Sequence, residues 1–399
     1  MTASLSPLLP VYSPPDLIFE RGEGPYLFTK TGARYLDFIS GIAVTALGHG
    51  HPHLVAALKA QADKLWHLSN MFLVEDQLRL AQRYVDATFA DQVFFTNSGT
   101  EAIEGALKMA RRYHFAKGAP ERFVVLTFEG AFHGRSYGAV NAGGNQIYLE
   151  GFGPRLPGYR QLPFGDHAAL EAAAAEPDVC AILIEPVQGE GGLREVPGVC
   201  LQGLRRLADA HDLLLIYDEV QCGAGRTGKL FAHQWTGGAE PDVMAVAKGV
   251  GGGFPMGAVL ANLRGASGMA RGVHGTTFGG NPLAMAVGNA VMDVMLAEGF
   301  FDSVNARANE LAQGLAGLKD LYPDLVLEVR GKGLLRGLRL ARDPKPVQAA
   351  ARERGLLCGV AGQNTLRLAP PLLMEAAHVS AALGVIDAAL AAETKAKAA

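Results

Sequence analysis

The segment Leu213–Lys248 contains two short apolar runs that each end in one charged residue. The first reads LLLIYD and ends at Asp218, and the second reads VMAVAK and ends at Lys248. Runs that are apolar at nearly every position are typical of parallel strands buried on both faces. Similar runs stand earlier in the chain, at 92–95 (QVFF), 122–127 (RFVVLT) and 180–184 (CAILI). Helical patterns separate them, which predicts an α/β fold with a largely parallel sheet covered by helices on both faces.

The composition indicates a large, strongly buried protein. At 399 residues the chain exceeds the usual size of one domain, so we expect two domains and a core large enough for an enzyme. Charged residues make up 19%, against an average of about 25% in globular proteins. The net charge of −3 gives no reason to expect nucleic acid or an anionic membrane as a partner.

The cysteines and the N-terminal segment favour a cytoplasmic protein. The four cysteines form no CxxC pair, which is typical of a reduced protein. The first residues, MTASLSPLLPVYSPPD, lack a basic start and are interrupted by prolines, so they make a poor signal peptide. No apolar run approaches the roughly 18 residues that a membrane span needs.

The pattern changes character near residue 298. Asn281-Pro282 is a favourable helix start, and we expect the helix to end at about Glu298. Alternating strands and helices follow, which predict a smaller α+β domain, and the N-terminal residues join it. We therefore expect a large domain at 47–298 and a small domain built from 1–46 and 299–399.

Two motifs resemble sites for which the context is wrong. The stretch 223–230, GAGRTGKL, matches GxGxxG, but Asp218 and Glu219 stand between it and the preceding strand and would repel a pyrophosphate. The stretch 48–53, GHGHPH, alternates three histidines, but no cluster of cysteines or aspartates accompanies them. We predict a turn at each position and no metal site.

Asp218 and Lys248 follow strands of one parallel sheet, so both side chains are expected in the crevice at its carboxyl edge. Pyridoxal phosphate requires a lysine for its Schiff base and an acid against its ring nitrogen. Burial lowers the pKa of a lysine, so that its free amine serves as nucleophile and base. The alternative for Asp218 is an ordinary helix cap.

The stretch 97–101, NSGTE, opens a helix directly after a strand and suits the cofactor's phosphate. The free N–H groups of such a helix end attract an anion, and Gly99 lets the anion approach the backbone. The alternative is that Ser98 and Glu101 form only a capping box.

Seven ordered motifs together resemble the class III (ω-amino acid) aminotransferases of fold type I, which depend on pyridoxal phosphate. They read SGTEAIEGALKMAR, FEGAFHGR, IEPVQGEGG, YDEVQCGAGRTGKLFAH, AKGVGGGFPMGA, HGTTFGGNP and LRLAPPL. The resemblance runs from about Glu20 to the last helix. It implies a mostly parallel seven-stranded sheet in the large domain and a smaller α+β domain built from both termini.

The resemblance also implies a role for each matching cofactor residue. Lys248 forms the Schiff base and Asp218 faces the ring nitrogen. The remaining contacts are Gln221 to the ring hydroxyl, Val220 under the ring, Phe132 on its opposite face, and Ser98, Gly99 and Thr100 at the phosphate. Thr277 is implied to reach the phosphate from the other subunit, which makes a homodimer the minimal functional unit. Plain core for Phe132 and an exposed turn for Thr277 are the alternatives.

Three charged residues are implied to select the substrates. Arg367 binds the α-carboxylate of glutamate by a bidentate fork, and Glu190 pairs with Arg367 when an ω-amino donor enters. Arg135 holds the carboxylate at the far end of either substrate. A surface salt bridge for Arg367 and a turn acid for Glu190 are the alternatives.

Within the family, GIAVTALGHGHP and KLWHLSN resemble members that transfer the δ-amino group of N-acetylornithine to 2-oxoglutarate in arginine biosynthesis. Other members act on succinylornithine, ornithine, 4-aminobutyrate or a carrier-bound lysine derivative. The segment Met71-Phe-Leu73 departs from that subgroup, which often carries aromatic residues there. A nicotinamide-dependent dehydrogenase and a non-catalytic relative are the alternatives from other classes.

Overall fold

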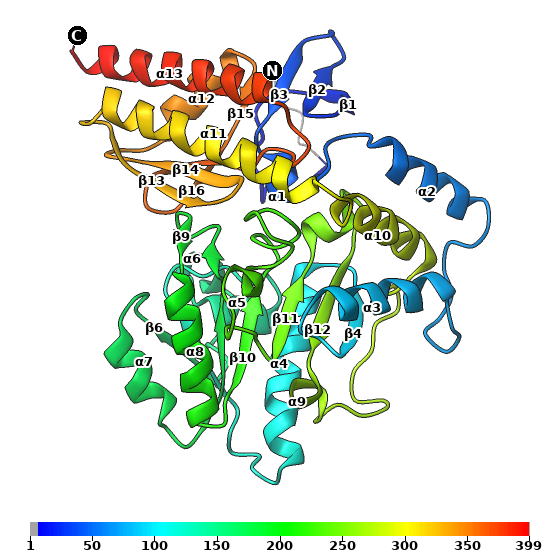
Figure 1. Cartoon of the computed structure of the whole chain (residues 1–399). Coiled ribbons are helices and arrows are strands. Elements are labelled where there is room, and N and C mark those ends of the chain that lie inside the picture. The colour runs from blue at the N-terminus through cyan, green and yellow to red at the C-terminus, as the bar shows by residue number, and fades with distance from the viewer. Residues whose placement is uncertain (1–6, 399) are drawn as a thin grey trace.

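A computed structural model of the chain describes residues 7–398 and contains a large and a small domain, one above the other in Figure 1. The large domain is built on a seven-stranded sheet. Its order is β4 (Gln92–Thr96), β12 (Gly257–Ala261), β11 (Val243–Val246), β10 (Leu214–Asp218), β7 (Val179–Ile184), β5 (Val124–Phe128) and β6 (Tyr159–Leu162). Only β12 runs antiparallel to its neighbours. The prediction of a mostly parallel seven-stranded sheet is therefore confirmed.

The central strands are buried on both faces because successive side chains point to opposite layers of helices. Ile216 of β10 packs with α4 (Gly99–Ala116), α5 (Tyr137–Gly143) and α9 (Leu263–Ala266). Its neighbour Tyr217 packs in the other layer. That layer contains α3 (Glu75–Ala87), α7 (His167–Ala174), α8 (Gly198–Ala210) and α10 (Pro282–Met295). This two-sided burial explains why the strands lack polar alternation.

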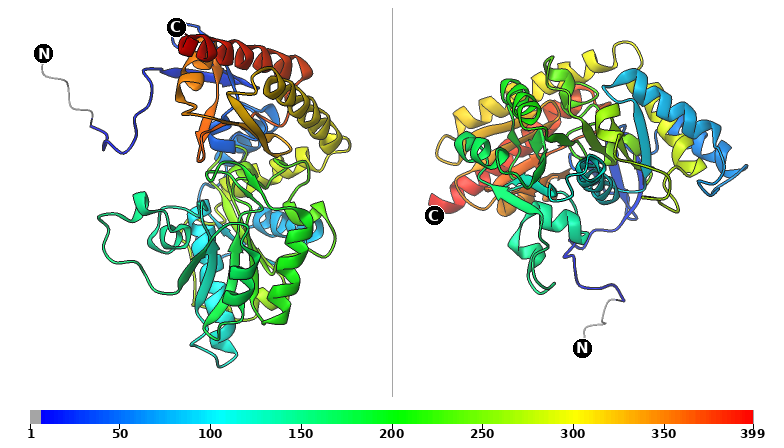
Figure 2. Two further views of the ribbon diagram at one scale, coloured as in Figure 1. Left: turned by 90° about the vertical axis from the view of Figure 1, so that its left-hand side faces the viewer. Right: turned by 90° about the horizontal axis from the view of Figure 1, so that it is seen from below.

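The small domain joins the two ends of the chain. One sheet consists of β1 (Phe19–Glu23), β2 (Tyr26–Thr29), β3 (Arg34–Asp37) and β15 (Leu356–Leu357). The other consists of β13 (Val326–Lys332), β14 (Leu335–Leu340), β17 (Thr365–Leu368) and β16 (Gly359–Ala361), with helices α11 (Phe300–Leu321), α12 (Lys345–Glu353) and α13 (Ala376–Ala398). Strands β3 and β15 pair in parallel although more than three hundred residues separate them in sequence. Figures 1 and 2 show α11 and α13 side by side above these sheets.

Short elements complete the chain. They are α1 (Ser40–Ala43), α2 (Pro52–Ala62), α6 (Gln146–Leu149), β8 (Val187–Gln188), β9 (Arg194–Glu195) and two 3₁₀ turns, η1 (Ala232–Trp235) and η2 (Lys248–Gly251). The long helix that was expected to end at about Glu298 ends at Met295, and Asn281 caps it by accepting a hydrogen bond from the Ala284 N–H over 2.9 Å.

Helix α13 is the one helix within residues 7–398 that is long and apolar enough by itself to cross a membrane. Its apolar stretch is interrupted by His378, Ser380 and Asp387, so it is not an unbroken apolar run. Val379, Ile386 and Leu390 of this helix are buried in the hydrophobic core of the small domain. These residues recur at helical spacing, so one face of α13 packs on that core.

Element α1 is a left-handed turn rather than a regular helix. Ser40, Gly41, Ile42 and Ala43 all have positive φ, and Ile42 has φ 66° and ψ 58°. A β-branched residue in this region is a rare and strained conformation. The turn leads directly into Val44, which lines the pocket described below.

The GAGRTGKL motif is a turn, as predicted, whereas the GHGHPH motif enters helix α2 at Pro52. Nε2 of His49 is hydrogen-bonded to Oδ2 of Asp37 over 2.8 Å, and Nε2 of His53 is hydrogen-bonded to Oδ2 of Asp293 over 2.8 Å. No group of three metal-ligating side chains occurs between residues 7 and 398. The GAGRTG segment is not followed by a helix, and its buried Arg226 donates hydrogen bonds to the carbonyls of Leu334 and Pro370 in the small domain.

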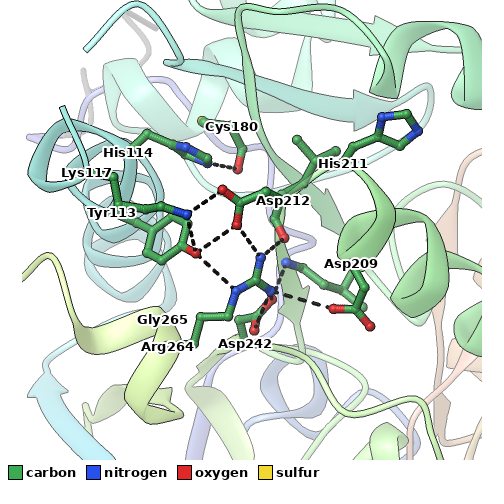
Figure 3. A network of polar contacts seen from close by, with 12 residues as sticks. Tyr113, His114, Lys117, Cys180, Asp209, His211, Asp212, Asp242, Arg264 and Gly265 are labelled. Atoms are coloured by element: carbon green, nitrogen blue, oxygen red, sulfur yellow. Dashed lines mark hydrogen bonds and ion pairs between the residues drawn. The ribbon is translucent and has the colours of Figure 1, made fainter. Parts of the chain in front are cut away.

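A polar network closes the opposite, amino-terminal edge of the sheet (Figure 3). Asp212, which precedes β10, accepts hydrogen bonds from Tyr113, Lys117 and Arg264. Arg264 also binds both oxygens of Asp242, which precedes β11, over 3.1 Å. The network therefore ties α4 and α9 to the starts of two central strands.

Candidate active site

A cavity of about 310 Å³ opens at the carboxyl edge of the sheet, where the side chains that follow β4, β5, β7, β10 and β11 converge. Its lining includes Val44, Ser98, Gly99, Thr100, Phe132, His133, Glu185, Glu190, Asp218, Val220, Gln221 and Lys248. Most of the residues predicted from the sequence are therefore brought together here. Arg135, Thr277 and Arg367 are not among the residues that line it.

Lys248 stands two residues after the end of β11, at the start of η2, and lines the cavity. Its φ of 49° lies in the left-handed region, so the chain turns sharply at this residue. Burial lowers the pKa of the amine below its ordinary value, and the nearby Arg367 acts in the same direction. The amine is thus favoured as a neutral nucleophile at a lower pH than that of a free lysine.

Asp218 ends β10 and is paired with a residue that sequence reasoning missed. Its Oδ2 lies 2.7 Å from Nδ1 of His133, and its Oδ1 accepts a hydrogen bond from the Val220 N–H over 3.0 Å. No helix follows Asp218, so the helix-cap alternative was wrong. His133 stands in the FHGR motif, and its position after a central strand was the signal available in the sequence.

The start of α4 presents free N–H groups to the cavity. The Ser98 side chain caps the helix by accepting a hydrogen bond from the Glu101 N–H over 3.3 Å. The Glu101 carboxylate accepts from the Asn97 N–H instead of returning to the cap residue, so the capping box is incomplete. A Cβ on Gly99 would lie 2.6 Å from Val220, so this position requires glycine. The helix start is therefore open to an anion.

Arg367 and Glu190 form an ion pair between the two domains. Nη1 of Arg367 donates to Oε1 of Glu190, and Gln221 donates to the same oxygen over 3.2 Å. Arg367 is 6% exposed, so the surface-salt-bridge alternative was wrong. Burial opposes ionisation of Glu190, but the charge and hydrogen bond of Arg367 hold the pKa of Glu190 below its ordinary value. The pair is therefore charged at neutral pH.

Two of the predicted residues lie outside the cavity. Arg135 is exposed, and its guanidinium carbon stands 3.8 Å from the centre of the Tyr148 ring. Thr277 is exposed in the loop before α10. Arg135 still touches the lining from outside, because its guanidinium carbon lies 5.5 Å from the centre of the Phe132 ring.

Glu185 is a second residue that the sequence reasoning missed. It follows β7, is 5% exposed, and lines the same cavity as Asp218 and Lys248. Burial, with a further contribution from the charge of Asp218, raises the pKa of its carboxyl to about 8. The cavity thus contains a buried acid for which the predicted roles have no place.

Comparison with known proteins agrees with this site. Residues 10–390 match the model of the family "Aminotransferase class-III". The chain is 59% identical to an acetylornithine aminotransferase from Mesorhizobium japonicum, over 96% of each chain. It superimposes with TM-score 0.84 on an N-acetylornithine aminotransferase from Stenotrophomonas maltophilia, which is 38% identical, with 96% of this chain and 98% of the other covered.

An ornithine aminotransferase from Toxoplasma gondii also superimposes, with TM-score 0.93 and 29% identity over 98% of this chain and 94% of the other. Its active site holds pyridoxal phosphate at partial occupancy. The family match spans almost the whole chain, and the fold agrees. The chain therefore belongs to the class III aminotransferases and is a transaminase that depends on pyridoxal phosphate.

Proposed function

We propose that the enzyme transfers the δ-amino group of N2-acetylornithine to 2-oxoglutarate, giving N-acetylglutamate semialdehyde and glutamate. The observation that carries the proposal is the buried Arg367–Glu190 pair beside Lys248. The relatives named above as acetylornithine and N-acetylornithine aminotransferases support the choice of donor. Arginine biosynthesis is the pathway that this reaction serves.

The residues present fit pyridoxal phosphate. Gly99 leaves room at the start of α4 that a Cβ would fill, and Ser98 and Thr100 lie beside it in the lining, which suits a phosphate. Phe132 and Val220 line the cavity as apolar faces for the ring, and Gln221 lies within reach of a ring hydroxyl. When bound, the cofactor forms a Schiff base with an amine and serves as the electron sink for transamination.

Lys248 and Asp218 supply the chemistry of this chain. Lys248 would hold the cofactor through its amine, and Nζ would serve to move a proton once released. Asp218, which His133 and the Val220 N–H hold in position, would offer its carboxylate to the ring nitrogen. Asp218 ends β10, and Lys248 stands two residues beyond the end of the neighbouring β11. The two strands pair in register from Ile216 with Val243 to Asp218 with Ala245, which sets the relative position of the two residues.

Arg367 and Glu190 allow one cavity to accept two donors in turn. An ω-amino donor presents no carboxylate to Arg367, so Glu190 remains paired with it and no buried charge is left alone. Glutamate presents its α-carboxylate, which displaces Glu190 and forms a bidentate pair with Arg367. Arg135 is proposed to bind the distal carboxylate of both substrates.

Thr277 supports a homodimer with shared active sites. Asn70 donates hydrogen bonds over 3.1 Å to the carbonyls of Thr276 and Gly279, which places the segment 65–73 against the loop of Thr277. This surface exposes large apolar side chains, namely those of Trp66, Met71, Phe72, Leu73 and Phe278. Such a contiguous apolar surface is typical of a subunit interface. A second copy seated there would bring its own Thr277 towards the neighbouring phosphate site.

We also propose that the large domain spans residues 47–298 and that the enzyme is cytoplasmic. Cysteines 180, 200, 222 and 358 are all free, which suits a reducing compartment.

The visible absorption spectrum of the pure enzyme tests the proposed donor. N-acetylornithine is expected to bleach the bound cofactor's band faster than ornithine, succinylornithine or 4-aminobutyrate added separately. If another donor bleaches the band faster, the enzyme is still a transaminase but the proposed substrate is wrong.

Lys248→Ala is expected to fold and to lose turnover. Sustained transamination by this variant would contradict the proposed role of the lysine. Light scattering of the wild type is expected to give twice the mass of one chain.

A further inference from the structure

Glu185 holds two loops of the cavity through their backbones. Its Oε1 accepts a hydrogen bond from the Phe132 N–H over 2.8 Å, and its Oε2 accepts one from the Gly189 N–H over 3.2 Å. Phe132 belongs to the loop after β5, and Gly189 belongs to the loop after β8. One side chain therefore joins two loops that no strand pairing connects directly.

The Gly189 residue is held from both sides. While its N–H binds Glu185, its carbonyl accepts a hydrogen bond from Arg367 over 3.3 Å. The next carbonyl, that of Glu190, accepts from the Gly362 N–H of the small domain over 2.8 Å. A Cβ at Gly189 would lie 1.8 Å from Oε1 of Gln221, so the glycine lets this side chain pack against the backbone. The position of the Glu190 backbone thus depends on Glu185 on one side and on the small domain on the other.

The Phe132 peptide connects Glu185 to the other half of the site. His133 follows Phe132 immediately and pairs with Asp218 over 2.7 Å. Three charged groups interact with the Glu185 carboxyl. Asp218 raises the pKa of Glu185 and His133 lowers it. Glu185 in turn raises the pKa of Lys248. A buried acid that contacts no ion-pair partner is costly unless backbone donors satisfy it.

We propose that Glu185 is a positioning residue that fixes the Phe132–His133 loop and the Gly189–Glu190 loop relative to each other, one carboxylate oxygen binding each loop. Through the Phe132–His133 loop, Glu185 sets the positions of the Phe132 ring and of Asp218. Through the Gly189–Glu190 loop, it sets the position of the Arg367–Glu190 pair. The significance for donor choice rests on the function proposed above, but the loop contacts themselves do not.

The test compares amide hydrogen exchange in cofactor-free protein for Glu185→Gln, Glu185→Asp and wild type. The glutamine offers one acceptor oxygen and places an NH₂ group against the other backbone N–H. Exchange at Phe132, at Gly189 or at both is expected to accelerate by about 3- to 10-fold, since a backbone N–H loses its hydrogen-bond acceptor. The shorter aspartate reaches at most one loop and is expected to release one site only.

Glu219→Gln is the matched control. Glu219 is also a buried glutamate, is 1% exposed, accepts hydrogen bonds from the Ala232 N–H with both oxygens, and has its pKa raised to about 8, first by burial. It does not line the cavity. Its variant is expected to accelerate exchange at Ala232 and to leave Phe132 and Gly189 unchanged. Thermal unfolding of each variant verifies that it is folded.

Two outcomes would overturn the proposal. One is unchanged exchange at both sites in folded Glu185→Gln, and the other is equal acceleration at these sites in the control. A kinetic measurement adds the donor choice: Glu185→Gln is expected to lower kcat with both donors and to raise KM for glutamate relative to that for N-acetylornithine several-fold. If exchange is altered and this KM ratio is unchanged, Glu185 still positions the two loops, and it is the proposed switch between donors that is wrong.

Discussion

Nδ1 of His133 lies 2.7 Å from Oδ2 of Asp218, and both side chains are buried at the carboxyl edge of the sheet. Nε2 of His133 has no hydrogen-bond partner among the side chains and backbone of residues 7–398. Burial opposes the charged imidazole, yet the hydrogen bond and charge of Asp218 raise the pKa of His133 above its ordinary value. The ring therefore donates to Asp218 and keeps this carboxylate facing one direction.

His133→Asn is expected to lower kcat by about 10- to 100-fold, since it removes a hydrogen bond to a charged group worth about 1.5–3 kcal/mol. Steady-state kinetics at saturating donors measures this. Because the pKa of His133 is raised on folding, the protonated ring stabilises the wild type at pH values below the pKa of an unfolded histidine. This stabilisation is lost as the pH rises through the pKa of the folded state. The free energy of unfolding of the cofactor-free variant is expected not to show this decrease with pH. His114→Asn is the control, because His114 of α4 is also buried but pairs with the Cys180 carbonyl of β7. A similar loss of kcat in this control would contradict the assignment.

Glu190→Ala is expected to leave Arg367 free for an α-carboxylate. The ratio of kcat/KM for glutamate to that for N-acetylornithine should rise by about 10-fold or more, because one partner of a buried pair worth several kcal/mol is removed. The half-reaction with each donor, followed separately, measures the ratio. Glu195→Ala is the matched control, since Glu195 also pairs with a small-domain cation, Lys332, over 2.7 Å but outside the cavity. An unchanged ratio in Glu190→Ala would contradict the switch.

Lys248→Met is expected to stabilise the cofactor-free enzyme although it abolishes turnover. The amine is held where burial lowers its pKa, so replacing it should add about 0.5–2 kcal/mol to the free energy of unfolding. The stability lost through this lysine is greatest below its folded pKa and diminishes as pH rises towards the ordinary value of 10.5. Thermal unfolding from pH 7 to 10 should therefore show a difference in stability between variant and wild type that becomes smaller as the pH rises. A difference independent of pH would disprove this explanation.

Asp212→Asn is expected to weaken the network of Figure 3. Burial opposes its charge, but hydrogen bonds from Lys117, Tyr113 and Arg264 hold the pKa of Asp212 well below its ordinary value. Its contribution is present above the unfolded pKa of about 4 and is lost as pH falls towards the folded pKa. Because this carboxylate is 40% exposed, we expect about 1 kcal/mol or less at pH 7. Urea unfolding from pH 7 to 3 measures it, with Asp178→Asn as the control, since Asp178 is similarly exposed but pairs with Arg160 alone.

The strands and the residues at their ends were readable because each leaves a local pattern. Apolar runs mark the buried strands, and Asp218 and Lys248 were found by the rule that ligands bind beyond the carboxyl edge. His133 and Glu185 also follow central strands, but their roles depend on partners 85 and 53 residues away in the sequence, which no local pattern reveals. The left-handed turn at Ile42 contradicts local propensity, so only packing in the folded protein imposes it.

The parallel pairing of β3 with β15 has a consequence for how the enzyme is made. Residues near the two ends of the chain meet in one sheet, so this sheet cannot form on the ribosome until nearly all of the protein has been synthesised. Asp218 and Lys248 are translated more than a hundred residues before Arg367. A chain truncated before β17 would contain the residues proposed to hold the cofactor but would lack Arg367, the proposed receptor for the α-carboxylate of glutamate. Selectivity between donors is thus the last property that the growing chain acquires.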